Sequence, residues 1–501
     1  MDSAVLNQLF RQLFRHPACQ SLRPSLSGRR ANCVRLSGPS RQQCRSFLTR
    51  RAPTKRKEPD DGMLWSRRGD YPKDIGEELK VYPLVTAKDL RHRRDRPRQV
   101  KMLTREFIDD SLYNPHYGYF SKHATIFSPG EPFDFNSIND GPEFHRMLGE
   151  RYTEFEDKLD ETHPDVARQL WHTPTELFRP YYGETIARYL VSNYKLTLYP
   201  YHDLIIYEMG AGNGTMMINI LDFIRDTDYE VYQRTKFKII EISPALAGLQ
   251  MKNLVDSINA AGHLDHVEII NRSIFDWDTY VHSPCFFLGL EVFDNFGHDA
   301  IRYDTKTELP QQGGVLIDGD GEFHEFYNTQ LDPVASRFLR VRQAAARRQF
   351  PSPLGPKFLR GARSALPLQR FTQPEYIPTR LMQFFDILDT YFPAHRLVAS
   401  DFSTLPDAVP GVNAPVVQTR YKRRTVPVST PFVHQGYFDI FFPTDFNVIE
   451  DVYRAVTGKL TQVMSHEDFV RRWAYIEDTE TRSGENPLLT WYKNASMLMT
   501  V

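Results

Sequence analysis

Asp203-Leu-Ile-Ile-Tyr-Glu-Met-Gly-Ala-Gly-Asn-Gly-Thr215 joins a predicted strand to a predicted helix through a glycine-rich turn. The apolar run at residues 204–207 predicts a buried parallel strand, and Glu208 follows where that strand ends. Three glycines at a spacing of two come next: Gly210, Gly212 and Gly214. Glycines at such a turn let the backbone approach a ligand closely, because no Cβ atom intervenes. Open α/β sheets bind cofactors beyond the carboxyl ends of their strands, so the turn predicts a cofactor site.

The spacing of these glycines separates two classes of cofactor. A dinucleotide-binding turn follows G-x-G-x-x-G, whereas here the third glycine comes one residue early. The pattern E-x-G-x-G-x-G instead resembles motif I of the class I S-adenosylmethionine-dependent methyltransferases. That resemblance implies S-adenosyl-L-methionine as the cofactor and leaves a nicotinamide dehydrogenase as a distant alternative.

Two further carboxylates follow the next predicted strands. Lys236-Phe-Lys-Ile-Ile-Glu241 is strand-like, and an acidic residue at that position usually binds the ribose hydroxyls in the methyltransferase superfamily. A carboxylate suits a diol because it can accept two hydrogen bonds at once. Asp276, after the third strand, is a candidate for the adenine amino group. The alternatives are a glycine turn that binds nothing and, for Asp276, a charge at a helix N-terminus.

Composition excludes few classes of function. The chain has 501 residues and a formal net charge of -1, so no global field favours DNA or RNA. Its length allows one large decorated domain or two domains. The longest apolar runs, such as residues 285–290, are far too short to span a bilayer, so we expect no transmembrane segment.

The N-terminus differs from the rest. Between Met1 and Lys57 the only acidic residue is Asp2, against eleven arginines and two lysines. An amphipathic, Arg-rich and Ser-rich start is typical of a mitochondrial transit peptide, and Arg45-Ser-Phe47 resembles a matrix-processing site. We therefore expect residues 1–47 to be removed and the mature protein to lie in the matrix. The alternative is a basic arm that binds anions.

The cysteines argue against disulfides and metal. Three of the four cysteines lie in the expected leader, so Cys285 alone would remain in the mature chain. A disulfide or a thiolate zinc site within one mature protomer is then excluded. The sequence has no His-Glu-x-x-His motif and no phosphate-binding G-x-x-x-x-G-K-[ST] loop, and we expect no metal site.

Regular alternation of strand and helix from residue 203 predicts the fold class: α/β, a doubly wound, mostly parallel sheet of the Rossmann-like methyltransferase type, with an N-terminal helical extension. The expected strands are 204–207, 236–241, 267–270, 285–290 and 395–400, the last ending at Asp401, with 436–442 added antiparallel at the sheet edge. Five segments follow: a transit peptide (1–47), a charged linker or wrapping segment (48–98), a helical and aromatic segment (99–200), the cofactor-binding domain (201–450) and a helical tail (451–501).

An insertion at about residues 305–390 separates the fourth and fifth expected strands. Residues 336–350 predict a basic helix, which a Pro-, Gly- and Arg-rich loop follows. A basic helix could contact a partner, an anionic lipid surface or RNA, although a solvated helix face is the simpler interpretation.

Several motifs together resemble the MidA-like family, which includes the mitochondrial protein-arginine methyltransferase that assists assembly of respiratory complex I. The matching segments run in order along the chain: Leu103–Phe120, Thr173–Glu184, Glu208–Thr215, Glu241–Leu246 and Ser400–Phe402. The resemblance implies methyl transfer to a protein substrate, with a complex I subunit as a candidate partner. It also points to Glu176 and Tyr119 as pocket residues, by motif position alone.

The chain departs from the family after the fourth strand. Where the family reads A-N-E-x-x-D-A-L-P, this sequence has Leu290 in place of the Asn and lacks the Leu-Pro, but keeps Glu291 and Asp294. A pair of carboxylates can clamp a guanidinium and orient one nitrogen towards a methyl donor, so these two are the candidate catalytic residues. The alternative is a loop-capping carboxylate and a surface charge.

Three functional hypotheses remain from the sequence. The first is an active mitochondrial protein methyltransferase, with arginine as a candidate acceptor. The second is an assembly or scaffold factor that keeps the fold without turnover, which the altered strand-four motif favours. The third is a mitochondrial RNA methyltransferase, which rests on the basic segments alone.

Overall fold

The computed structural model describes residues 75–122, 125–162, 170–256, 260–347, 354, 370–406, 413–421 and 423–501. The expected transit peptide, the first part of the expected linker and most of the loop after the basic helix lie outside these ranges.

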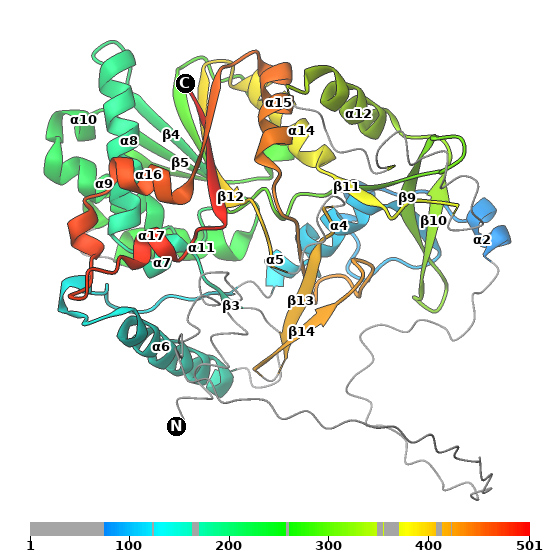
Figure 1. The fold of residues 1–501 in the computed structure, drawn as a ribbon, viewed down its shortest axis with the longest axis horizontal. Coiled ribbons are helices and arrows are strands. Elements are labelled where there is room, and N and C mark those ends of the chain that lie inside the picture. Colours follow the sequence, from blue (N-terminus) through cyan, green and yellow to red (C-terminus); the bar gives the residue numbers. More distant parts are fainter. Residues whose placement is uncertain are drawn as a thin grey trace, which may run out of the picture.

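A seven-stranded sheet forms the centre of the molecule (Figure 1), in the order β16-β17-β12-β7-β4-β5-β6. The five predicted parallel strands are confirmed: β4 (Leu204–Met209), β5 (Thr235–Glu241), β6 (Val267–Asn271), β7 (Cys285–Leu290) and β12 (His395–Phe402). From β4 the chain first adds β5 and β6 on one side and then returns to add β7 and β12 on the other. The carboxyl ends of β4 and β7 therefore flank a topological switch point.

Helices cover both faces of this sheet (Figure 1). Along β4, Ile206 packs with one core and Tyr207 with the other, as expected for a strand buried on both sides. The first core includes residues of α8 (Tyr181–Thr197), α9 (Thr215–Thr227) and α16 (His466–Trp473). The second includes residues of α12 (Pro333–Ala345), α14 (Thr379–Tyr391) and α15 (Phe446–Thr457). The doubly wound arrangement predicted from the sequence is therefore present.

The predicted edge strand at residues 436–442 was wrong in its position. β15 (Asp439–Phe441) instead pairs with β13 (Val416–Tyr421), which also pairs with β14 (Arg424–Val428) in a separate three-stranded sheet. The antiparallel place beside β12 is taken by β17 (Ala495–Thr500), and β16 (Thr461–Ser465) pairs outside it.

The C-terminal tail is consequently not purely helical. α15 and α16 confirm the helical part, but the chain ends in β17. Ala495-Ser-Met-Leu-Met-Thr500 is rich in residues that favour helices, which hid the strand from sequence analysis. Pairing with the buried β12 overrides that propensity, because strand preference depends mainly on packing context.

The insertion between β7 and β12 was predicted as helical and basic, and it begins instead with strands. β8 (Asp299–Tyr303), β9 (Pro310–Ile317) and β10 (Phe323–Asn328) join β1 (Val100–Leu103) and β11 (Glu375–Ile377) in a five-stranded sheet. Gly314 weakened the strand signal of β9, yet the fold needs it: a Cβ there would lie 2.6 Å from the Met102 carbonyl oxygen.

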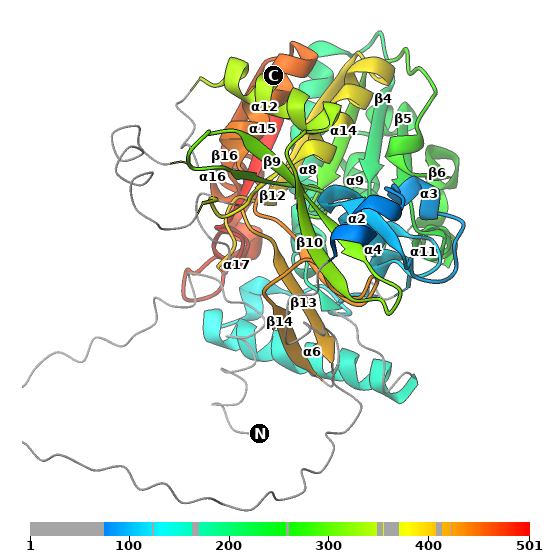
Figure 2. The ribbon, with the colours of Figure 1, turned by 90° about the vertical axis from the view of Figure 1, so that its right-hand side faces the viewer.

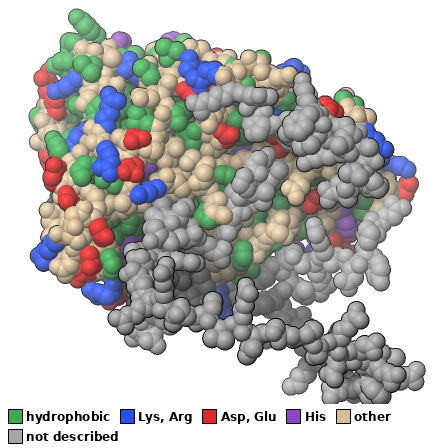
Figure 3. Space-filling model, in the orientation of Figure 1, with side chains coloured by type: hydrophobic (Ala, Val, Ile, Leu, Met, Phe, Trp, Pro, Cys, Tyr) green, Lys and Arg blue, Asp and Glu red, His purple; other side chains and the backbone are tan. Residues whose placement is uncertain are grey.

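The basic helix of the insertion is present as α12, and two of its three arginines pair with acids of this protein. Arg337 pairs with Asp386 at 2.5 Å, and Arg342 pairs with Glu375 at 3.0 Å. On the face seen in Figure 3, positive and negative side chains are interspersed over the described part of the chain. These pairings favour the solvated or internally paired interpretation of the basic helix over RNA contact.

The segment before β4 packs against both the inserted sheet and the central domain. The described end of the expected linker forms α2 (Gly76–Val81) and α3 (Ala87–Leu90), and Leu90 is fully buried, so this part is packed against the fold. The remaining elements up to β4 are α4 (Thr104–Tyr113), α5 (Tyr119–Lys122), β2 (Thr125–Ile126), α6 (Gly141–Thr162), β3 (Leu170–Trp171) and α7 (Pro174–Leu177). Figure 2 shows α6 beside the β13–β14 hairpin.

Two short helices complete the β4–β6 half, α10 (Tyr229–Gln233) and α11 (Pro244–Asp256), and α17 (Pro487–Thr490) precedes the last strand. Within the described ranges, no helix combines the length and apolar character that crossing a membrane requires.

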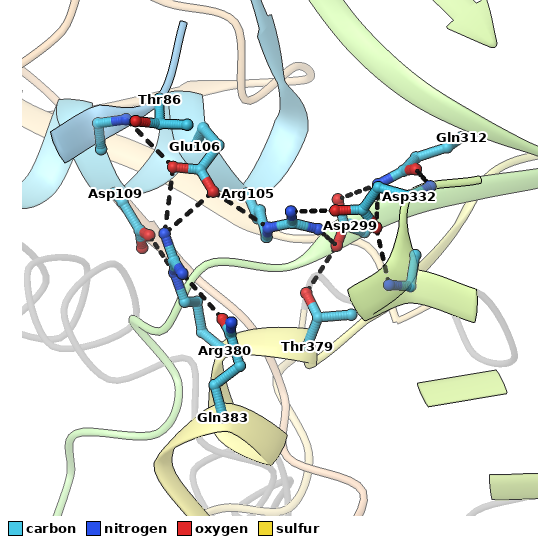
Figure 4. Close-up of polar contacts among 12 residues, drawn as sticks. Thr86, Arg105, Glu106, Asp109, Asp299, Gln312, Asp332, Thr379, Arg380 and Gln383 are labelled. Atoms are coloured by element: carbon cyan, nitrogen blue, oxygen red, sulfur yellow. Dashed lines mark hydrogen bonds and ion pairs between the residues drawn. The ribbon is translucent and has the colours of Figure 1, made fainter. Parts of the chain in front are cut away.

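A buried ion network joins α4 to the inserted sheet and to α14 (Figure 4). Arg105 donates to Asp299 at 2.6 Å and to Asp332, and it contacts Glu106 at 3.2 Å. Arg380 of α14 reaches Glu106 from the other side at 3.1 Å. The Arg105 and Asp299 side chains are 7% and 0% exposed, so each needs the other as a compensating charge.

Replacement of Arg105 is expected to destabilise the fold strongly. Arg105→Met keeps most of the side-chain volume but leaves Asp299 buried without its cation, which should lower the free energy of unfolding by about 3–5 kcal/mol. Urea denaturation of the two proteins measures the difference. Arg146→Met, which removes an ion pair on the exposed face of α6, is the control and should leave the unfolding midpoint unchanged. Equal midpoints for wild type and Arg105→Met would contradict this account of the network.

Candidate functional site

A cavity of about 970 Å³ lies at the carboxyl ends of β4, β5 and β7. Its lining includes the glycine turn, the loop after β7 and parts of α3, α4 and β13. The predicted site residues meet in this one cavity lining: Glu208, Gly210, Gly212, Glu241, Asp276, Glu291 and Asp294. Gly214 lies one residue beyond the lining Asn213, at the start of α9. Residues far apart in sequence are therefore brought together where an open α/β sheet binds its ligand.

The three glycines adopt backbone conformations that other residues rarely adopt. Their φ angles are 71° at Gly210, 55° at Gly212 and 80° at Gly214. A Cβ at Gly212 would lie 2.5 Å from the Ile126 side chain, and one at Gly210 would lie 2.9 Å from Val292. The turn thus needs glycine for its conformation and for the narrow space above it. Such a cradle fits a ligand that is approached by backbone rather than by side chains.

Glu241 is tied to the glycine turn. Its Oε1 accepts from the Ser243 backbone N–H at 2.9 Å, and its Oε2 accepts from Gln250 Nε2 at 2.9 Å. The same Gln250 nitrogen donates to the Gly212 carbonyl oxygen at 2.9 Å. Each carboxylate oxygen keeps a free acceptor direction, so Glu241 can still accept from a ribose diol at the cavity wall. The fixed position fits the role predicted from the sequence.

Glu208 is a buried carboxylate without a counter-charge. Burial, and then the nearby charge of Glu241, raise its pKa to about 8. Its Oε2 atom is buried and has no hydrogen-bond partner among the described residues. A group in this state favours a cationic or hydrogen-donating ligand, because such a ligand would satisfy the orphaned oxygen.

Asp276 lines the same cavity as Glu241. Its Oδ2 accepts from Arg91 Nη1 of the N-terminal segment at 2.6 Å, and both residues line the cavity. This hydrogen bond therefore attaches the N-terminal segment to the cavity wall at Asp276. Sequence analysis placed Asp276 at the adenine end but had no signal for its arginine partner, because residues 185 positions apart form the pair.

Glu291 and Asp294 follow β7 and enter the cavity lining together. Glu291 has a φ of 54°, and its backbone N–H donates to the Ser400 carbonyl oxygen at 2.8 Å. Asp294 is buried, and its Oδ1 has no hydrogen-bond partner among the described residues. Burial raises the pKa of both carboxyl groups well above their usual range, and Asp401 adds to each shift.

Two further carboxylates hold the loop after β7 through hydrogen bonds. Asp401, at the end of β12, accepts from the backbone N–H groups of Phe293 at 2.8 Å and Asp294 at 3.2 Å, and burial raises its pKa to about 7. Asp439 of β15 accepts from Asn295 Nδ2 at 3.1 Å. The end of a predicted strand could have marked Asp401 as a site residue. For Asp439 there was no such signal, because its strand belongs to the unpredicted sheet.

Aromatic side chains enclose the acidic end of the cavity. Tyr113, Tyr182, Trp491 and Tyr492 line it together with Glu291. Burial, and then the charge of Glu291, raise the pKa of Tyr492 well above its usual value. Flat apolar walls beside carboxylates suit a planar cation such as guanidinium, which stacks on rings and pairs with acids.

The four arginines in the cavity wall are already paired, and Arg272 pairs with Asp278. Arg91 pairs with Asp276, Arg380 with Glu106, and Arg420 with Glu156 at 2.7 Å. Among the ion pairs of the described residues, none involves Glu208, Glu291 or Asp294. The site therefore offers unpaired carboxyl groups that a cationic ligand would ionise, which disfavours an anionic dinucleotide and favours a cationic cofactor and a cationic acceptor.

Comparison with known proteins gives a family match over most of the central domain. Residues 185–465 match the family described as "Putative S-adenosyl-L-methionine-dependent methyltransferase". This range contains the glycine turn, Glu241, Asp276 and the Glu291–Asp294 loop.

Two curated yeast proteins are similar to the chain, and both are named "Protein arginine methyltransferase NDUFAF7 homolog, mitochondrial". The Schizosaccharomyces pombe protein is 26% identical over 392 residues, 75% of this chain and 80% of its own length. The Saccharomyces cerevisiae protein is 23% identical over 340 residues, 64% of this chain and 77% of its own length. A solved structure from Burkholderia thailandensis, bound to S-adenosyl-homocysteine, has the same fold, with a TM-score of 0.52 and 14% identity over 80% of this chain and 87% of its own.

The raised pKa of Glu208 predicts a pH-dependent stability in the absence of ligand. The pKa of its carboxyl rises from 4.5 when exposed to about 8 in the fold, so the folded state holds a proton that the unfolded chain has lost. The contribution of the protonated Glu208 to the free energy of unfolding is fully present below about pH 4.5. It is lost as the pH rises to about 8, by at most about 1.4 kcal/mol per pH unit.

Glu208→Gln removes this titration. The variant should match the wild type near pH 5 and be the more stable protein at pH 8, as measured by thermal unfolding without cofactor. A constant difference between the two melting temperatures from pH 5 to pH 8 would show that Glu208 does not carry the raised pKa.

Proposed function

The chain belongs to the family of S-adenosyl-L-methionine-dependent methyltransferases, and on that premise we propose that it methylates arginine side chains of mitochondrial proteins. The observation that carries the proposal is the pair Glu291 and Asp294, two carboxyl groups without a cationic partner among the described residues, which line the same cavity as the glycine turn.

We assign the cofactor to the part of the cavity formed by the glycine turn, Glu241 and Asp276. Backbone groups at Gly210, Gly212 and Gly214 can approach it closely, and Glu241 can accept from its ribose hydroxyls. Asp276 then serves the adenine end, with Arg91 as its present partner. Bound there, the cofactor supplies an electrophilic methyl group on a sulfonium.

Glu291 and Asp294 then act on the acceptor. A guanidinium is a poor nucleophile because its charge is delocalised, so the enzyme must hold one nitrogen in line with the methyl group. Two carboxylates can grip the other nitrogens and draw positive charge towards themselves as the new bond forms. Asp401 holds this loop through hydrogen bonds from the backbone N–H groups of Phe293 and Asp294.

The names of the yeast relatives support arginine as the acceptor and mitochondria as the location. The Arg-rich, acid-poor leader supports entry into the matrix by an independent route, because composition and not homology predicts it. The resemblance to the MidA-like family supports a complex I subunit as the protein substrate.

Loss of either acceptor carboxylate should reduce turnover while leaving cofactor binding intact. Glu291→Gln and Asp294→Asn are each expected to lower kcat/KM for methyl transfer by about 10- to 100-fold, the loss of one charge-assisted hydrogen bond or more. The assay follows isotopic methyl transfer from S-adenosylmethionine to proteins of a mitochondrial extract, with mass spectrometry to locate methylarginine.

Glu268→Gln is the control, because Glu268 lies on the outer strand β6, pairs with Lys238 of β5 and does not line the cavity. It should keep full activity. Methyl groups found on lysine or RNA instead of arginine, or unchanged activity in both cavity variants, would refute the proposal.

A further inference from the structure

Glu176 of α7 reaches over the glycine turn from a segment that precedes the cofactor-binding domain. Its Oε1 accepts two hydrogen bonds, from Asn213 Nδ2 at 2.9 Å and from Thr215 Oγ1 at 2.6 Å. Both donors flank Gly214, where the turn becomes helix α9. One carboxylate oxygen is thus used to hold the turn in place.

The other carboxylate oxygen of Glu176, Oε2, makes no hydrogen bond of this kind. Glu176 is 2% exposed, and its Oε2 atom is buried without a hydrogen-bond partner among the described residues. Nη1 of Arg179 lies 3.7 Å from that oxygen, which is too far for a hydrogen bond. A buried carboxylate oxygen left without a donor is costly, and its residue lines the same cavity as the turn.

The backbone around Glu176 is fixed. The Thr173 side chain accepts from the Glu176 backbone N–H at 3.2 Å, and Pro174 occupies the first turn of α7. The carboxylate is therefore held in one position by its own helix and by Asn213 and Thr215, in a residue that lines the cavity. A preorganised acceptor of this kind suits a cationic group that donates several hydrogen bonds.

The two buried carboxylates at the turn have different neighbours. Glu208 lies at the end of β4, beside β5, which ends at Glu241 of the predicted ribose end. Glu176 instead bonds to residues 213 and 215, at the last part of the turn. The cofactor of this family carries a positive α-ammonium group at the end opposite its adenosine.

We infer that Glu176 binds the α-ammonium group of the cofactor through its free Oε2 atom. An ammonium has three N–H donors and would satisfy the orphaned oxygen with a charge-assisted hydrogen bond. Arg179, 3.7 Å from the same oxygen, does not line the cavity. The inference rests on the family's cofactor and is independent of the identity of the methyl acceptor.

The test combines one substitution with one ligand change. Glu176→Gln keeps a carbonyl oxygen for Asn213 and Thr215 but replaces the free anionic oxygen. S-adenosylhomocysteine is compared with 5′-S-(3-carboxypropyl)-5′-thioadenosine, the same molecule without its amino group. Calorimetric titration of the full chain gives four dissociation constants, and no methyl acceptor is involved.

The inference predicts strong coupling in this cycle. Glu176→Gln should weaken S-adenosylhomocysteine binding by about 10- to 100-fold and leave binding of the deaminated analogue within about twofold. Wild type should lose a similar factor when the amino group is absent. Equal losses for both ligands in the variant, or no loss for either, would overturn the assignment.

Thr215→Val is the matched control, because it removes a hydrogen bond to Glu176 without removing the charge. It should affect both ligands alike. Thermal unfolding of each variant shows that it is folded, so a lost interaction is distinguished from a lost structure. Unchanged affinities of Glu176→Gln for both ligands would leave the arginine proposal untouched and would reject the role of Glu176.

Discussion

Burial of carboxyl groups without counter-charges is the constraint that shapes this protein. Glu208, Glu291 and Asp294 all line one cavity, and burial raises the pKa of each carboxyl above its usual value. A fold tolerates such groups only if packing elsewhere outweighs their cost or a ligand removes it. A sulfonium cofactor and a guanidinium acceptor are both cations, so the same deficit of positive charge serves both ligands.

The rest of the fold supplies cations to several other buried acids. Asp299 has Arg105, Glu106 has Arg380, and Glu156 has Arg420. These pairs join the N-terminal segment and the inserted sheet to the central domain, so the cavity walls come from parts of the chain that are distant in sequence (Figure 4). Methyl transfer depends mainly on positioning two reactants, and a wall tied by buried ion pairs supplies rigidity for that purpose.

Sequence analysis predicted the centre of the fold well and its additions poorly. The five parallel strands were recognisable because each is a short apolar run bounded by turn residues. β17 was missed because its Met and Leu residues favour helix, and only pairing with β12 makes it a strand. The inserted sheet was missed because Gly313 and Gly314 interrupt the strand pattern, although close contact with Met102 and Phe326 requires one of them.

The residues of the site also divide into those that the sequence could predict and those that it could not. Residues at the ends of predicted strands, such as Glu241 and Glu291, were accessible to sequence reasoning because parallel strands end at one edge. Asp439 and the Arg91 partner of Asp276 were not, because tertiary contacts between distant segments place them. Glu176 was marked by motif position alone, and only the structure gives it a physical task, two hydrogen bonds to the glycine turn.

A structure of the protein with S-adenosylhomocysteine and an arginine-containing peptide tests the central claim most directly. The account predicts the nucleoside against Glu241 and the glycine turn, the sulfur directed towards the loop after β7, and the guanidinium between Glu291 and Asp294. A guanidinium bound elsewhere, or a cofactor whose sulfur points away from these two carboxylates, would contradict it.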